Sequence, residues 1–221
     1  MQYSIFSILI LSFLTLPLGA QPSQQNIPRV IKPNDGIPSG WKMRLDHQNA
    51  SMDGVKFTIN NGEYHFEIGP SQAAIYYKPD MKASGSYSMQ AQFTQLAKTD
   101  HPEAYGIFIG GKNLQESNQE YLYFLIRQDG KYLIKRRSGS DTQTISGWTA
   151  SNSVKALGNM DEVTNTLKIT CTQDAVKFMA NGEVLKTVPK SQLNYLNGIA
   201  GLRVNHHLHL NVNNFELNTM D

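Results

Sequence analysis

The residues that could carry out chemistry are densest near the C-terminus, in the stretch GLRVNHHLHLNVNNF (201–215). Because side chains alternate between the two faces of a strand, a single strand here would place His206 on an apolar face, as a hydrogen-bonded core histidine. The opposite face would be polar and would carry Arg203, Asn205, His207 and His209. The last two have the i, i+2 spacing of a metal-binding pair, but the stretch contains no Asp, Glu or Cys as a third ligand. We therefore predict no metal site and interpret the polar face as a surface that binds hydroxyl groups.

Paired carboxylates occur in the stretch EYHFE, where Glu63, His65 and Glu67 share one face of an expected strand. Such pairs can hydrolyse glycosides, because one carboxylate attacks the sugar while the other protonates the leaving oxygen. A solvated strand surface explains the same pattern. His101 and Glu103, in a loop before the expected strand 104–111, are further candidates for a general acid or base.

Aromatic and basic side chains form a second kind of candidate site, in EYLYFLIR (120–127) and the strands expected beside it. Aromatic rings offer flat apolar surfaces to the C–H faces of sugars, and Arg donates hydrogen bonds in a fixed fork. The predicted face comprises Tyr105, Tyr121, Tyr123, Leu125, Arg127 and Arg136. It is either a glycan groove or the semi-buried rim of a central sheet.

The elements that must position these residues are short strands separated by turns. Period-two alternation marks 86–96, runs that are apolar on both faces mark 104–111 and 120–127, and Asn181-Gly182 predicts a tight hairpin turn. No amphipathic helix is evident. The pattern predicts an all-β sandwich of two large antiparallel sheets, a jelly roll. The stretch 138–165 is polar and is expected to be irregular; within it, Trp148 either packs on a neighbouring strand or is offered to a ligand.

Composition limits the location and the partners of the chain. A net charge of +2 over 221 residues, without a basic run, argues against binding nucleic acid. Residues 1–20 resemble a secretory signal peptide, which predicts a secreted or periplasmic protein that does not span the membrane after cleavage. Residues 21–40 hold four prolines and are expected to form an extended arm or linker, leaving 41–221 as a single domain. Cys171, the only cysteine, is expected to be a small buried apolar residue.

Two stretches carry a resemblance to a known superfamily. NTLKITCTQDAVKFMANGEVL followed by GIAGLRVNHHLHLNVNNFEL, together with AYGIFIGGKNLQESNQEYLYFLIRQDGKYLIKRR, resembles the concanavalin A-like, laminin-G-like jelly rolls. The nearest in style are exported bacterial domains of the 3-keto-disaccharide hydrolase-like, or family-16-glycosidase-like, kind. The resemblance covers roughly residues 41–217 and implies the fold and a carbohydrate partner. Laminarinase-type members carry an E-x-D-x-E strand, which this chain lacks.

We therefore predict an exported jelly-roll domain that binds carbohydrate without a recognisable catalytic carboxylate motif. A glycoside hydrolase or keto-disaccharide hydrolase and a structural or adhesion module with a protein partner are the alternatives. The catalytic candidates are Glu63, His65, Glu67, His101 and Glu103; the ligand-binding candidates are Tyr105, Tyr123, Arg127, Arg136, Trp148, Arg203, Asn205 and His207. No cofactor is predicted. Calcium is left open because Asp129, Asp141 and Asp161 lie in expected turns, although none has a second acid at a useful spacing.

Overall fold

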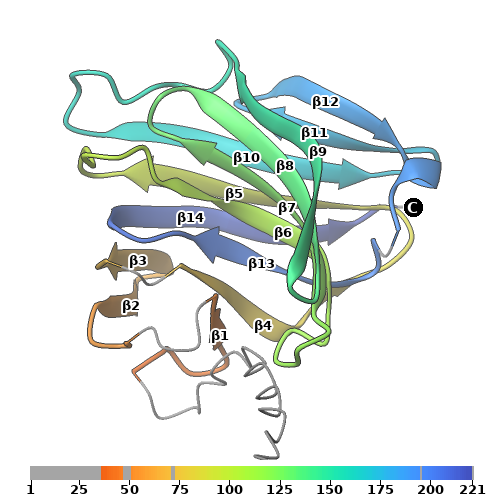
Figure 1. Cartoon of the computed structure of the whole chain (residues 1–221), viewed down its shortest axis with the longest axis horizontal. Helices are drawn as coiled ribbons and strands as arrows, with labels where there is room; N and C mark the ends of the chain where they lie inside the picture. Colours follow the sequence, from red (N-terminus) through yellow and green to blue (C-terminus); the bar gives the residue numbers. More distant parts are fainter. Residues whose placement is uncertain (1–35, 47–50, 71–72, 195, 221) are drawn as a thin grey trace, which may run out of the picture.

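The computed structural model describes residues 36–46, 51–70, 73–194 and 196–220. They form two antiparallel sheets of seven strands each, sheet A and sheet B, which lie one behind the other in Figure 1. In spatial order, sheet A consists of β1 (Lys42–Leu45), β4 (Ala74–Ala83), β13 (Gly198–Val204), β6 (Ala104–Lys112), β7 (Glu120–Arg127), β8 (Lys131–Ser138) and β9 (Asp141–Ala150). Sheet B consists of β12 (Glu183–Pro189), β11 (Ala175–Ala180), β10 (Val163–Cys171), β5 (Tyr87–Gln95), β14 (Leu208–Thr219), β3 (Glu63–Ile68) and β2 (Val55–Asn60).

This architecture confirms the predicted all-β jelly-roll sandwich. The described residues contain one short helix, η1 (Lys190–Gln192), and no helix that could span a bilayer. The predicted signal peptide and residues 21–35 of the predicted arm lie outside the described residues.

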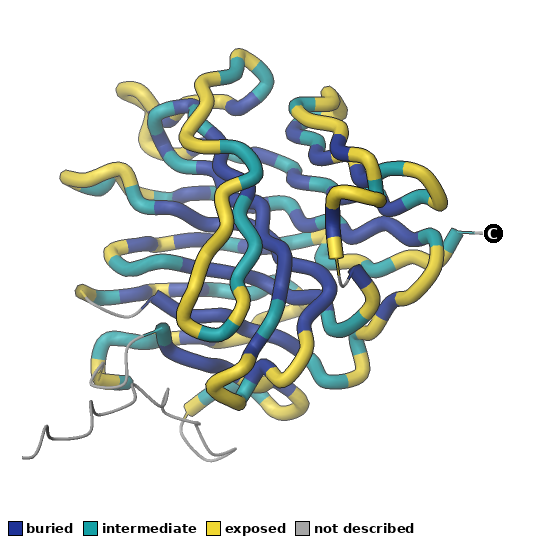
Figure 2. Tube along the Cα trace, turned by 45° about the vertical axis from the view of Figure 1, so that its right-hand side comes forward, coloured by how far each residue is buried: buried dark blue, intermediate teal, exposed yellow. Residues whose placement is uncertain are grey.

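The sandwich is held together by side chains that alternate along its strands. In β10, every second residue from Val163 to Cys171 is buried and the residues between them are half-buried. Cys171 is fully buried, as expected of a small apolar residue. Buried segments follow the central strands of both sheets, whereas exposed residues gather in the turns and along edge strands such as β9 (Figure 2). The predicted turn at Asn181-Gly182 is confirmed, and both residues have the positive φ that a type I′ hairpin requires.

Strand β7 is buried on both faces. Leu122, Phe124 and Ile126 point into the core between the sheets. Tyr121, Tyr123 and Leu125, which alternate with them, point to the other face of sheet A. There they belong to a second apolar cluster, whose other members are Ile75, Tyr77, Ala104, Phe108, Leu114 and Leu133. We call this face, which points away from sheet B, the outer face of sheet A.

The expectation that 138–165 is irregular is wrong for its first part. Asp141–Ala150 form β9, which pairs with β8 at the edge of sheet A. An edge strand exposed on both faces has no reason to alternate apolar and polar residues, so its sequence lacks the period-two signal.

The stretch 201–215 is not one strand, which corrects a second expectation. Asn205, His206 and His207 form a turn between β13 in sheet A and β14 in sheet B, and His207 has a left-handed φ of 54°. The chain thus changes sheets within the histidine run. The His206 side chain is 37% exposed and lies 3.3 Å from Glu103 (Nδ1 to Oε1), so it is not a core histidine.

Truncation of a buried aromatic side chain should destabilise the core between the sheets. Phe124 is fully buried and its ring contacts those of Tyr132 and Phe178 edge-on. Phe124→Ala should lower the free energy of unfolding by about 3–5 kcal/mol, because it opens a cavity between the sheets. Urea denaturation measures the loss. Met160→Ala, at a residue 54% exposed, should leave stability nearly unchanged; equal effects of the two changes would contradict this account of the core.

Candidate functional site

The outer face of sheet A is one of two surfaces that gather the candidate residues. Tyr121, Tyr123 and Arg127 lie on this face, where sheet B does not cover them. The rings of Tyr121, Tyr123 and Phe108 pack against one another, with centroids 5.3 and 5.6 Å apart. Tyr121 and Tyr123 are nonetheless only 2% and 6% exposed. They form the floor of the face rather than a row of open rings.

A buried ion pair lies on this floor. Arg203 of β13 forms a two-pronged ion pair with Asp46 and donates from Nη1 to the Tyr121 hydroxyl over 3.0 Å. Its guanidinium also stacks over the Tyr123 ring at 5.1 Å. Burial alone would lower the pKa of Arg203, but the Asp46 charge raises it above its ordinary value. Burial raises the pKa of Tyr121 to about 12, although Arg203 opposes the shift, so its hydroxyl stays protonated and able to donate.

Trp148 is the exposed aromatic ring of this face. It lies on β9 and is 40% exposed, and the Arg127 guanidinium is stacked on its ring at 4.3 Å. Arg127 is held in place by Asp129, which accepts its Nε and Nη2 hydrogens over 2.7 and 2.8 Å. Lys131 approaches the same carboxylate to 3.3 Å. Burial would raise the pKa of Asp129, but hydrogen bonds and charges from Arg127 and Lys131 hold it below its ordinary value.

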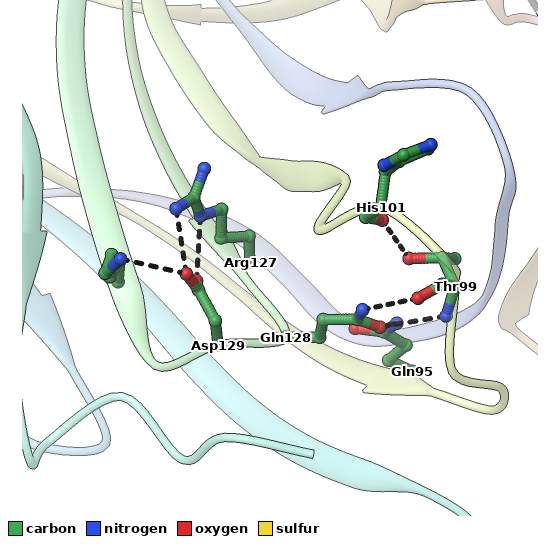
Figure 3. A network of polar contacts seen from close by, with 7 residues as sticks. Gln95, Thr99, His101, Arg127, Gln128 and Asp129 are labelled. Carbon is green, nitrogen blue, oxygen red and sulfur yellow. Dashed lines mark hydrogen bonds and ion pairs between the residues drawn. The ribbon is translucent and has the colours of Figure 1, made fainter. Parts of the chain in front are cut away.

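Gln128, between Arg127 and Asp129, points to the opposite side of the same turn (Figure 3). Its side-chain oxygen accepts hydrogen bonds from Gln95 Nε2 and from the Thr99 amide, both over 3.0 Å. Its Nε2 donates to the Thr99 carbonyl over 2.7 Å. Gln95 ends a strand of sheet B, so this buried amide joins the two sheets and fixes the segment that carries His101.

That segment forms one wall of the second surface, which we call the end pocket. The pocket has a volume of about 370 Å³ and lies at one end of the sandwich. Its polar lining includes Glu67, His101, Glu103, His207 and His209. Three of the five acid–base candidates are therefore brought together with two of the three clustered histidines, a grouping that sequence spacing alone did not indicate.

Glu63 and His65 lie on the same strand as Glu67 but are bound to neighbouring residues. Glu63 accepts a hydrogen bond from Asn213 over 2.6 Å, and His65 contacts Asn211 at 2.8 Å and Glu63 at 3.3 Å. Glu67 forms an exposed ion pair with Lys56, whose hydrogen bond and charge lower the pKa of the carboxyl. A general acid that protonates a glycosidic oxygen needs a raised pKa, so Glu67 is poorly suited to that role.

Two residues predicted for the aromatic and arginine face lie elsewhere. Tyr105 is fully buried between the sheets and packs against Phe93. Arg136 alternates with the residues of the outer face and contacts Glu120 at 3.5 Å on the opposite side of sheet A. Arg137, one residue further on, pairs with Tyr121 across the ladder and shares its face. The prediction that Arg136 shares the face of Tyr121 was wrong by one residue, because the sequence alone does not fix the register in which β7 and β8 pair.

The remaining ligand-binding candidates do not share one face. Arg203 lies on the outer face of sheet A, whereas His207 lines the end pocket. Asn205 is in the turn between β13 and β14, where its backbone N–H donates to the Ala104 carbonyl over 3.0 Å. The sheet change described above separates them.

Metal ligands do not cluster in the part of the chain that the structure describes. No group of three or more His, Cys, Asp or Glu side chains there is placed to hold an ion. Of the aspartates left open for calcium, Asp129 is engaged by Arg127 and Lys131, and Asp141 begins an edge strand.

Comparisons with known proteins show the fold. No protein-family model and no curated protein sequence matches the chain. Among solved structures, the carbohydrate-binding module CBM66 from Bacillus subtilis has a TM-score of 0.59 at 8% identity, over 81% of this chain and 96% of that one. The carbohydrate recognition domain of Emp46p has a TM-score of 0.52 at 12% identity, over 81% and 88%. A proposed glycosyl hydrolase from Parabacteroides distasonis has a TM-score of 0.50 at 12% identity, over 85% and 92%.

Anchoring of the end-pocket wall can be tested at Gln128. Gln128→Ala leaves the Thr99 amide without its partner and removes one of the two acceptors of Gln95 Nε2, which should cost about 1–3 kcal/mol of stability. Hydrogen exchange of the segment 97–103 should become faster than in the parent chain. Gln143→Ala, at an exposed position of β9, is the matched control. Unchanged exchange at 97–103 in Gln128→Ala would refute the anchoring role.

The Asp129 interactions should make stability depend on pH. The folded-state pKa of this carboxyl lies below its ordinary value of 3.8, so its contribution is fully present above that pH and is lost as the pH falls through the folded value. The difference in unfolding free energy between the parent and Asp129→Asn should therefore shrink below about pH 4. Urea denaturation at pH 7, 5 and 3 measures it. Gln143→Ala, at an exposed position that does not titrate, should show no such trend; a difference for Asp129→Asn that grew on acidification would contradict the assignment.

Proposed function

We propose that this chain, which has the jelly-roll fold of the concanavalin A-like superfamily, is an exported carbohydrate-binding domain that acts without catalysis. The glycan would bind on the outer face of sheet A, against Trp148. Export remains a prediction from the N-terminal apolar run and is part of the proposal.

The observation that carries this proposal is the fixed, partly exposed Trp148 ring. Large aromatic side chains are mostly buried, so a ring that is 40% exposed on a sheet face is available to a partner. Arg127, itself locked by Asp129, is stacked on Trp148 and orients the ring before any ligand arrives. A rigid platform loses little entropy on binding, which favours a ligand that offers only C–H faces and hydroxyls.

Polar groups beside the platform support the choice of a sugar. Asp129 binds both Lys131 and Arg127, whose guanidinium is stacked on the ring, and Lys135 follows along the same face of β8. Charged donors and acceptors of this kind can hydrogen-bond to several hydroxyls of one glycan while the ring stacks on an apolar sugar face. The names of two structural relatives, a carbohydrate-binding module and a carbohydrate recognition domain, are consistent with the proposal. Since one fold serves many functions, the argument depends on Trp148 and not on those names.

Glycoside hydrolysis is the second candidate, favoured by the end pocket. His101 and Glu103 lie there beside Glu67, in a hollow large enough for part of a sugar ring. The lowered pKa of Glu67 counts against it as the acid, which leaves Glu103 and His101 to fill that role.

Trp148→Ala tests the proposed function. Affinity electrophoresis against a panel of neutral and acidic polysaccharides should show at least one retarding ligand, and the substitution should weaken that binding about tenfold or more, which corresponds to roughly 1.4 kcal/mol. Val184→Ala, at a residue 49% exposed on β12 of the other sheet, is the matched control and should bind as the parent does.

The same panel separates binding from turnover. Incubation should release no new reducing ends from the bound polysaccharide. Release that disappears in His101→Ala or Glu103→Gln would replace the binding proposal with hydrolysis at the end pocket. Retention that survives in Trp148→Ala would refute the assignment of the platform.

A further inference from the structure

Three arginines converge on the outer face of sheet A, away from Trp148. Arg44 of β1, Arg203 of β13 and Arg137 of β8 all lie on this face, as their pairing with Ile75 and Tyr121 shows. We call these three residues the arginine cluster. They come from strands far apart in the sequence, so only the folded sheet brings them together.

Arg44 is the least compensated charge of the cluster. It is only 2% exposed, and its Nη1 donates to the carbonyls of Leu114 and Glu116 over 2.8 and 2.6 Å. Its Nε and Nη2 are buried and make no hydrogen bond, and none of the ion pairs of the described residues involves it. Burial lowers the pKa of Arg44 and the charge of Arg137 lowers it further, whereas Tyr121 and the charge of Asp46 act in the opposite direction. A buried charge that forms no direct ion pair is costly, so its presence calls for an explanation.

Asp46 does not neutralise the cluster. Both of its oxygens bind Arg203, whose Nε is also buried without a hydrogen-bond partner. The charge of Arg137 acts on Arg44, Tyr121 and Tyr123, which places it beside the same floor. Among the ion pairs of the described residues, Asp46 is the carboxylate that meets these three guanidinium groups, so this part of the face carries an excess of positive charge.

Arg137 and Lys135 bring that charge to the surface. Both are half-buried on β8, and Lys135 lies opposite Tyr123 in the ladder. Arg137 donates from Nε to the Gly139 carbonyl over 3.0 Å, which holds the side chain while its two terminal nitrogens make no hydrogen bond within the described residues. The charge of Arg44 acts from below in a medium of low dielectric, where it strengthens the attraction of Arg137 for an anion.

We propose that the arginine cluster, together with Lys135, binds an anionic group of the glycan, either the carboxylate of a uronic acid or a sulfate ester. This inference rests on the proposed function, since it names the class of polysaccharide that the same face would accept. Arg137 offers the planar fork that matches either group with two hydrogen bonds. From Lys131, which pairs with Ala150 two residues beyond Trp148, to Arg137, β8 covers roughly 20 Å, at about 3.3 Å per residue. One extended chain could therefore stack on Trp148 and place an acidic group at the cluster.

The test compares polygalacturonate, dextran sulfate and neutral dextran as ligands in affinity electrophoresis and calorimetry. The parent chain should bind at least one of the two acidic polymers, and added NaCl should weaken the binding. Arg137→Ala should weaken it about tenfold or more, and Arg137→Lys should restore only part of the loss because the fork is missing. Which acidic polymer binds distinguishes carboxylate from sulfate recognition.

Lys177→Ala removes an exposed positive charge from β11 of sheet B and is the matched control. Equal losses in Lys177→Ala and Arg137→Ala would reveal general attraction to polyanions and overturn the inference. Thermal denaturation shows whether each variant is folded. If Arg137→Ala does not fold, Lys135→Ala tests the same cluster.

The inference and the proposed function can fail separately. The parent chain could bind neutral polymers, with the binding lost in Trp148→Ala and kept in Arg137→Ala. This outcome would overturn the proposal of an acidic ligand and support the Trp148 platform. The parent chain could instead bind an acidic polymer, with the binding lost in Arg137→Ala and kept in Trp148→Ala. This outcome would support the arginine cluster and refute the Trp148 platform. Absence of binding to every polymer would overturn both.

Discussion

Burial of both faces of β7 is the constraint on which the rest of this structure depends. A sandwich covers only the inner face of each sheet, yet Tyr121, Tyr123 and Leu125 place an apolar layer on the outer face as well. That layer must be shielded from water to contribute to stability. The segment after β6, through Leu114, covers one part, the Arg203 guanidinium lies over Tyr123, and Arg44 lies on the same face opposite Ile75. The chain thus uses charged side chains to cover an apolar surface.

Covering the layer with arginines has an electrostatic consequence. Their charges lie where water does not reach, so each needs a partner within the protein or at its surface. Arg203 finds Asp46 and the Tyr121 hydroxyl, whereas Arg44 finds only backbone carbonyls. At the other end of the face Arg127 and Lys131 share Asp129, which leaves one net positive charge there. The outer face is therefore asymmetric, with an aromatic end at Trp148 and a more strongly cationic end at Arg137.

The fold could be predicted from the sequence because the features that indicate it involve residues close together in the chain. Alternation in β5 and β10, Asn-Gly at a hairpin and the burial of Cys171 all depend on residues close together in the chain. The candidate site could be predicted only in part. Arg136 and Arg137 differ by one position, and only the ladder with β7 decides which shares a face with Tyr121. Arg44 and Asp46 were missed because their partners lie more than 70 residues away, beyond any pattern of spacing.

The turn after β7 has a consequence for how this protein can vary. Arg127 and Asp129 serve the outer face of sheet A, and Gln128 between them holds the wall of the end pocket. Because neighbouring side chains point in opposite directions, inserting or deleting one residue here would exchange the two sets and disturb both surfaces together. The length of this turn is therefore under a joint constraint. A change in the length of this turn would leave the fold in place but would disturb both of its candidate sites.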